Sequence, residues 1–225
     1  MPMRQYKYLT LIAMISAIVL PCATITLNKI IPIGYSSASA GTLTMPLWFI
    51  LGDIITEVYG YKISRQIFWY ALLCNFLFAV FTTLLVDLPS PKSWMGGYAY
   101  SFVFGNMMHI VCGAFIALMI GSFINNYLLS KWKVLVRGKY FWLRSLGSST
   151  VGEAVYTIIA GLLIFTGKLP FGKMAIIIMW SYFFKIVGSI LLSGPANLIV
   201  IYLKKKEGLD TYDVNVDFNP FKLST

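Results

Sequence analysis

The sequence predicts an all-α, polytopic membrane protein whose six transmembrane helices form one compact bundle. Of its 225 residues, 58% are hydrophobic and only 12% are charged, whereas a soluble domain carries roughly 25% charged residues. Six apolar runs are long enough to cross a bilayer, which takes about 20 residues. The connections between them are short, and the alternation expected of a transmembrane β-barrel is absent. A bilayer is therefore the expected main solvent.

The apolar runs predict the spans in chain order. They are Tyr8–Leu27, Leu43–Tyr61, Ile67–Leu88, Ser101–Leu129, Ser148–Thr166 and Met174–Leu203. The fourth and sixth runs are longer than a bilayer requires, so we expect tilt or extension beyond the membrane. Residues 1–206 are expected to form a single transmembrane domain, and residues 207–225 a polar, solvated cytoplasmic tail.

The basic residues predict the orientation. The chain has 18 Lys and Arg against 8 Asp and Glu, a net charge of +10. One side of the predicted topology carries Arg4, Lys7, Lys62, Arg65, Lys131, Lys133, Arg137, Lys139, Arg144 and Lys204 to Lys206, and the other side carries Lys29, Lys92, Lys168 and Lys173. The positive-inside rule then places both termini in the cytoplasm. The positive charge therefore reports topology, and we expect no nucleic-acid partner.

Signals for catalysis, metals and cofactors are missing from the sequence. Cys22, Cys74 and Cys112 lie inside apolar runs without C-x-x-C pairing, which is typical of small core residues. His109 is the single histidine, and its part in any site is left open. No phosphate loop, nucleophile elbow or metalloprotease motif occurs. We expect neither an enzyme nor a bound cofactor or metal.

Four ionisable residues lie well inside the predicted spans, where charges are costly and usually functional. Asp53 and Lys185 fall at about the same depth near the middle of the bilayer, which predicts an ion pair between them. Glu57 and Glu153 converge nearer the cytoplasm without a second basic partner inside the spans, which favours binding of a ligand or a proton. The alternative that all four only hold helices together stays open.

Other polar and small residues accompany these charges. Ser149 lies one helical turn from Glu153, with Tyr156 beside them, and Asn75 is a polar residue within the third span. Gly113, Ala117 and Gly121 form a ridge of small residues that lets helices approach closely. This ridge serves packing within the bundle or between protomers, so a homodimer is left open.

Three segments resemble the queuosine-precursor transporters, also called the vitamin uptake transporter family. The first is Gly41–Tyr61, which contains Pro46, Phe49, Asp53, Glu57 and Tyr59-Gly60 and is followed by Arg65; the others are Phe141–Arg144 with Ser148 to Thr150, and Tyr182–Lys185. The chain departs from the family pattern in the fifth span, where members often carry an amide residue and an Asp and this chain has Glu153 and Tyr156.

The resemblance implies a fold similar to the substrate-binding subunits of vitamin importers. It also implies import of 7-deazaguanine bases such as queuine, preQ0 or preQ1 across the inner membrane, for modification of transfer RNA. A carboxylate would accept the paired N–H donors of such a base, and aromatic rings would stack on its face. The expected substrate-binding residues are Phe49, Asp53, Glu57, Tyr59, Asn75, Trp142, Ser149, Glu153, Tyr156 and Lys185.

Two alternatives to this function remain open at the level of sequence. One is a substrate-binding subunit of a vitamin importer that needs a separate ATPase. The other is a membrane protein of structural or assembly function, in which the buried charges only fix helix packing.

Overall fold

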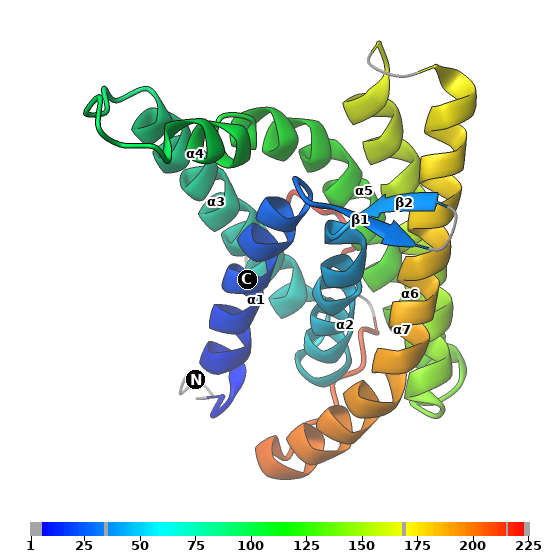
Figure 1. Ribbon diagram of the computed structural model, residues 1–225. Helices are drawn as coiled ribbons and strands as arrows, with labels where there is room; N and C mark the ends of the chain where they lie inside the picture. The colour runs from blue at the N-terminus through cyan, green and yellow to red at the C-terminus, as the bar shows by residue number, and fades with distance from the viewer. Residues whose placement is uncertain (1–5, 34–35, 168–169, 215, 223–225) are drawn as a thin grey trace.

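The computed structural model describes residues 6–33, 36–167, 170–214 and 216–222. These residues form long helices joined by short connections (Figure 1). The elements are α1 (Leu9–Thr26), β1 (Ile30–Ile33), β2 (Ser36–Ser39), α2 (Gly41–Tyr59), α3 (Tyr61–Val86), α4 (Gly97–Phe104), α5 (Met107–Leu135), α6 (Phe141–Phe165) and α7 (Phe171–Glu207). The predicted all-α bundle is confirmed, with a small antiparallel hairpin added between α1 and α2.

The six predicted spans correspond to α1, α2, α3, α5, α6 and α7. Among the described residues, five helical stretches are long and apolar enough to cross a membrane, and α2 falls outside this set. Most residues of α2 are buried, including Asp53 and Glu57, because α1, α3, α5, α6 and α7 all pack against it. A helix surrounded by protein does not need an apolar surface, so its polar residues lower its hydropathy without exposing charge to lipid.

Several helix boundaries differ from the prediction, and the differences in the fourth and fifth spans have a clear structural basis. The fourth span is interrupted at Gly105 and Asn106, which separate the short α4 from α5. The helix predicted to begin at Ser148 begins at Phe141, because Arg144 and Ser145 are buried with polar partners and do not end the helix.

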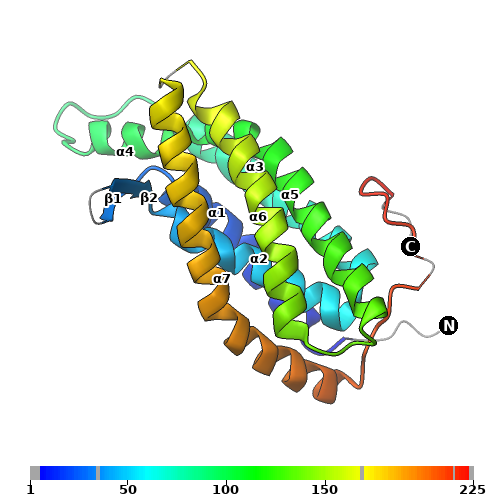
Figure 2. The ribbon, with the colours of Figure 1, turned by 90° about the vertical axis from the view of Figure 1, so that its right-hand side faces the viewer.

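The bundle has two distinct ends, which we name the hairpin end and the basic end. The hairpin end holds β1, β2 and the first residues of α2 and α7 (Figure 2). The basic end holds the start of α1 and the end of α7, where the backbone N–H of Tyr8 donates to Glu207 over 2.8 Å. The helices run alternately between these ends.

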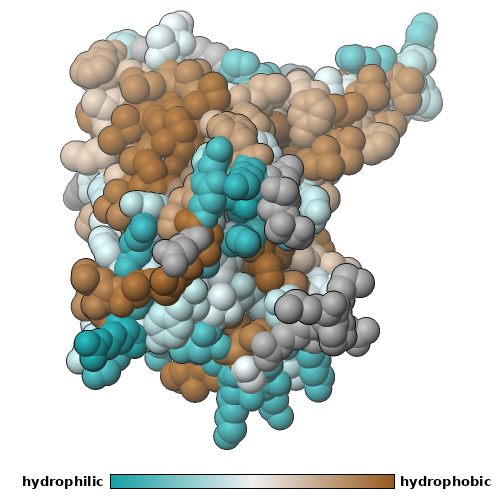
Figure 3. Space-filling model, turned by 180° about the vertical axis from the view of Figure 1, so that it is seen from behind, coloured by the Kyte–Doolittle hydropathy of each residue, from teal (hydrophilic) through white to brown (hydrophobic). Residues whose placement is uncertain are grey.

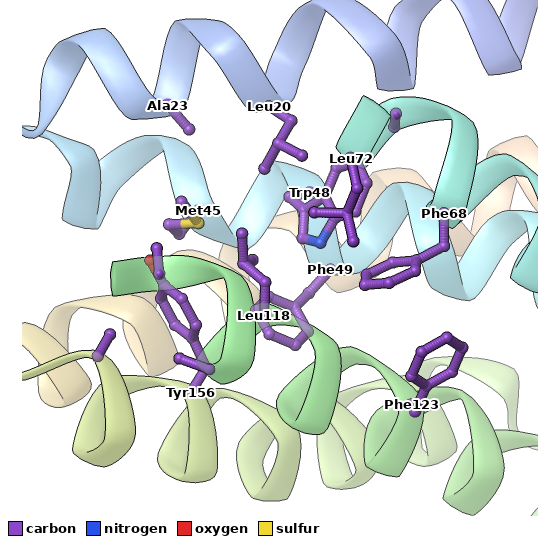
Figure 4. Close-up of a cluster of buried hydrophobic side chains, with 14 of the residues drawn as sticks. Leu20, Ala23, Met45, Trp48, Phe49, Phe68, Leu72, Leu118, Phe123 and Tyr156 are labelled. Atoms are coloured by element: carbon purple, nitrogen blue, oxygen red, sulfur yellow. The ribbon is translucent and has the colours of Figure 1, made fainter. Parts of the chain in front are cut away.

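The largest apolar core lies where α1, α2, α3, α5 and α6 meet. Figure 4 shows side chains of α2, among them Trp48 and Phe49, pointing into the same space as Leu118 of α5, while Tyr156 rises from α6 toward Met45. The crossing of α5 and α6 is especially close. A Cβ atom at Gly121 would lie 2.7 Å from the carbonyl oxygen of Gly152, so this member of the predicted small-residue ridge packs within the bundle.

The outer surface of the bundle suits a lipid environment. Large apolar side chains on α1, α3 and α7 are exposed, such as Ile18, Phe81 and Leu191. Seen from behind, the surface is brown over much of its upper part, and hydrophilic residues gather in the middle and at the bottom (Figure 3). The exposed apolar area is far more extensive than a soluble monomer shows, in agreement with a multi-pass membrane protein.

The described residues of the tail lie against the bundle, although many of their side chains are exposed. The carboxylate of Asp213 is buried, and it accepts hydrogen bonds from the backbone N–H of Tyr61 (3.0 and 3.1 Å) and the hydroxyl of Ser130 (2.7 Å). Arg65 and Trp69 of α3 donate to main-chain carbonyl oxygens farther along the tail. The segment after α7 therefore packs against α3 and α5, because their buried donors find acceptors in it.

Candidate functional site

A cavity of about 880 Å³ opens at the hairpin end of the bundle. Residues of the connection between α1 and β1, the hairpin, α2, α5, α6 and α7 line it, and most of them are apolar. The polar lining residues are Asn28, Ser39, Thr42, Asn106, His109, Tyr156, Thr157, Lys173, Ser181 and Lys185. A cavity of this volume, mostly apolar with a few polar groups, is typical of a small-molecule site.

Tyr156, Thr157 and Lys185 lie together where the cavity meets the middle of the bundle. The ammonium group of Lys185 donates to the hydroxyl of Thr157 over 2.8 Å and lies 4.3 Å from the ring centroid of Tyr156. All three residues are buried. They come from α6 and α7, so the cavity floor depends on the packing of these two helices.

Glu153 lies one helical turn from this floor and is fully buried. One carboxylate oxygen accepts a 2.8 Å hydrogen bond from Ser189 of α7. The other, Oε2, has no hydrogen-bond partner in the part of the chain that the structure describes. Leaving a buried acceptor unpaired costs about 1–3 kcal/mol. An unpaired acceptor at this depth is therefore a ready point of attachment for a ligand that donates hydrogen bonds.

The predicted ion pair between Asp53 and Lys185 is wrong. Asp53 accepts hydrogen bonds from Asn125 (2.6 Å), from Ser149 (3.0 Å) and from Ser145, and within the described residues it makes no ion pair. Spacing along a helix sets the depth of a residue, but sequence does not fix the rotation of each helix about its axis. Asp53 therefore faces α5 and α6, whereas Lys185 faces Tyr156 and Thr157.

The prediction that Glu57 and Glu153 converge without a second basic partner is also wrong, because Glu57 has cationic partners. Arg144 of α6 donates to both of its carboxylate oxygens (2.9 and 3.1 Å), and Lys204 of α7 donates over 2.6 Å. Lys133 of α5 lies 3.5 Å from the same carboxylate. Asp210 of the tail pairs with Lys133 (2.7 Å) and with Lys204 (2.8 Å). We name these five residues the Glu57 cluster, and it lies at the basic end, away from the cavity.

The remaining predicted site residues divide between the core and the surface. Phe49 is buried and packs against Tyr156, with ring centroids 6.2 Å apart. Asn75 is buried and accepts from Thr24 of α1 over 3.2 Å. Tyr59 donates to Glu207 at the basic end. Trp142 is 46% exposed, at the start of α6. The geometry thus places Tyr156 and Lys185 at the cavity, with Phe49 packed against Tyr156 and Glu153 one helical turn beyond the floor. Ser149 and Asp53 lie farther along from Glu153 and contact each other, and the other residues lie apart from this group.

Asn125, Ser145 and Thr157 contact the predicted site residues but were missed from sequence. Asn125 and Ser145 donate to Asp53, and Thr157 accepts from Lys185. Buried Asn and Ser residues in membrane helices often make interhelical hydrogen bonds, so residue type was a weak signal. Their partners do not follow from spacing alone.

The arrangement can bind a small, largely apolar molecule that also carries hydrogen-bond donors and acceptors. Lys185 and Thr157 offer polar contacts at the floor, Tyr156 offers an aromatic surface, and Glu153 offers an unpaired acceptor just beyond. Across the described residues, no cluster of three or more His, Cys, Asp or Glu suited to a metal ion occurs.

Comparisons with known proteins agree with a membrane transport site. A family model described as "Putative vitamin uptake transporter" matches residues 39–200, which is more than half of the chain. No curated protein and no solved structure gives a significant match. The matched segment runs from the hairpin through α7 and contains the cavity floor, Asp53, Glu57 and Glu153. The chain belongs to the vitamin uptake transporter family.

Proposed function

We propose that this membrane uptake transporter imports a 7-deazaguanine base, such as queuine, preQ0 or preQ1, for the modification of transfer RNA. The observation that carries the proposal is the position of Glu153. Its carboxylate is fully buried one helical turn beyond the floor of an 880 Å³ cavity, and its Oε2 atom has no partner within the described residues.

The chemistry of the base suits these groups. A deazaguanine carries adjacent N1–H and 2-amino donors, which a carboxylate accepts in a charge-assisted pair. Its carbonyl oxygen is an acceptor to which the ammonium group of Lys185 would donate, and its flat face would pack on Tyr156. Transport then requires that the site be exposed alternately to the two sides of the membrane.

The orientation of the cavity follows from the charge distribution. The basic end holds Lys204, Lys205 and Lys206, whereas Lys29 and Lys173 lie near the hairpin end. By the positive-inside rule, the basic end faces the cytoplasm of an inner-membrane protein, with both termini on that side. The cavity would then open to the outside, as uptake requires.

The test is uptake of labelled queuine by cells that lack their own transporter and express this chain. Glu153→Gln should abolish uptake while the protein stays in the membrane at its normal level. Asp87→Asn makes the same change of carboxylate to amide in the connection between α3 and α4 and should leave uptake unchanged. If the Glu153→Gln variant took up queuine at the wild-type rate, Glu153 would not be part of the substrate site. Absence of queuine, preQ0 and preQ1 uptake by the wild type would overturn the proposed substrate.

A further inference from the structure

The Glu57 cluster joins four helices and the tail at the basic end, opposite the cavity. Glu57 (α2) is held by Lys133 (α5), Arg144 (α6) and Lys204 (α7), and the carboxylate is fully buried. Asp210 then bridges Lys133 and Lys204 from the tail. A molecule that passes from the cavity to the basic end has to pass this layer. The cluster therefore closes the bundle at that end.

The last part of α7 contains a point at which the helix can bend. Pro195 has no N–H and cannot donate the helical hydrogen bond to Leu191, and it follows Gly194. The helix is bent in this region, and Figure 2 shows its last part (orange) turning away from the direction of its first part. A Cβ atom at Gly194 would meet open space, so no neighbouring side chain packs against this side of the helix at the bend.

The segment beyond this bend is fastened at its tip by polar contacts. Lys204 donates to Glu57 and pairs with Asp210. Glu207 accepts from the hydroxyl of Tyr59 (2.9 Å) and from the backbone N–H of Tyr8 (2.8 Å). Ala196, Val200 and Leu203 of this segment are buried in an apolar cluster that also contains Ile54 and Val58 of α2. Opening the segment therefore has to break this packing as well as the polar contacts of its tip.

We infer that residues 196–207 form the gate at the basic end, hinged at Gly194 and Pro195 and latched by Lys204 and Glu207. Release of the latch lets the segment swing away and opens a path from the cavity floor past Glu57. Asp210 holds Lys204 in the closed position, so the tail stabilises the closed gate. This inference rests on transport as such and does not depend on which base is carried.

The test measures opening without any ligand. Ser193 lies just before the hinge and is buried, so a cysteine placed there reports access to the interior. Cys22, Cys74 and Cys112 are first replaced by serine, and the full-length Ser193→Cys protein in detergent is treated with a charged methanethiosulfonate reagent. Lys204→Met should raise the labelling rate about tenfold, since it removes a partner of a buried carboxylate. Lys205→Met removes an exposed charge next to it and should leave the rate unchanged.

Two further variants separate the latch from the hinge. Glu207→Gln should also raise the labelling rate, because it weakens the contacts to Tyr59 and Tyr8. Pro195→Ala restores a helical hydrogen bond, so adding it to Lys204→Met should return labelling toward the wild-type rate. Equal labelling of Lys204→Met and Lys205→Met would overturn the latch, and fast labelling that persists with Pro195→Ala would overturn the hinge. The labelling experiment contains no ligand, so its results for the latch and the hinge would hold even if the protein did not take up queuine.

Discussion

Ser189 of α7 donates a hydrogen bond to only one of the two carboxylate oxygens of Glu153 on α6. The other oxygen has no partner in the described chain, so the two halves of one carboxylate have different environments. Ser189 fixes the orientation of the carboxylate and leaves Oε2 available. The same contact links α6 to α7 beyond the cavity floor.

Ser189→Ala should weaken uptake of the base without removing the protein from the membrane. The loss of one hydrogen bond to a charged group is about 1.5–3 kcal/mol, or roughly 10- to 150-fold in affinity. Ser193→Ala is a matched control, since Ser193 lies one turn along α7 and donates to the backbone carbonyl of Ile190. Titration of purified protein with queuine measures both. Equal affinities for the two variants would mean that Ser189 does not position Glu153.

Tyr156 and Trp142 should respond differently to truncation. Tyr156→Ala removes part of the cavity floor and the ring beneath Lys185, so uptake should fall at least tenfold, as expected for loss of about 1.4 kcal/mol or more. Trp142 is exposed at the start of α6, so Trp142→Ala should retain most uptake. The measurement is initial uptake rate at matched protein level. A larger loss for Trp142→Ala than for Tyr156→Ala would contradict the location of the site.

Gly121→Ala should destabilise the bundle by about 1–3 kcal/mol, because overpacking forces helices apart. Its Cβ would lie 2.7 Å from the carbonyl oxygen of Gly152. Gly113→Ala changes the same helix in the same way, but its Cβ would meet Ile164 at an ordinary 3.6 Å. Thermal unfolding in detergent should therefore show a clear loss for Gly121→Ala and little change for Gly113→Ala. A similar loss for both would mean that the close crossing is not specific to Gly121.

Docking of the tail should weaken in acid. Burial raises the pKa of Asp210, but the hydrogen bonds and charges of Lys133 and Lys204 outweigh it, so the pKa is lowered from its ordinary value. A group with a lowered pKa in the folded state stabilises that state above its unfolded pKa, about 3.9 for Asp. The contribution is lost as pH falls through the folded value. Protection of the tail from proteolysis should therefore hold near neutral pH and decline below about pH 4.

Asp210→Asn is the control for this pH dependence. It removes the titrating group, so the tail should be less protected near neutral pH, and the loss in acid should be smaller than in the wild type. The pKa of Asp213 is shifted in the opposite direction. Burial raises it, and this effect outweighs the lowering by the hydrogen bonds from Ser130 and from the backbone of Tyr61. Its contribution is present at low pH and lost as pH rises through the folded pKa. An unchanged acid response in Asp210→Asn would exclude Asp210 as its source.

The sequence predicted the helices well because an apolar run of spanning length satisfies its own backbone hydrogen bonds in a bilayer as a helix. It also singled out Asp53, Glu57, Glu153 and Lys185, since a charge inside such a run needs a partner. The partners of these charges could not be predicted from the sequence. Asp53 and Lys185 were expected at one depth, yet rotation of α2 and α7 about their axes turns them to different neighbours.

Glu57 illustrates a second limit. Lys133, Arg144 and Lys204 lie near the ends of their helices, where basic residues are ordinarily interpreted as topology signals. Their side chains are long enough to reach back into the bundle, and in the structure they meet Glu57. Some of the basic residues that predict the orientation are therefore also the partners of a buried carboxylate. The sequence alone does not show which basic residues only mark topology and which form buried ion pairs.

The last described part of the docked tail, residues 217–220, is bound through several of its main-chain carbonyl oxygens. Arg65 donates to the carbonyl oxygens of Asp217 and Asn219, Tyr61 to that of Phe218 and Trp69 to that of Pro220. Hydrogen bonds to carbonyl oxygens depend on the path of the backbone and place few demands on the side chains of the same residues. Outside Asp210, Asp213 and Phe218, whose side chains make contacts of their own, the tail can thus change in sequence over evolution more easily than in length, because one inserted or deleted residue would displace the carbonyl oxygens from their donors.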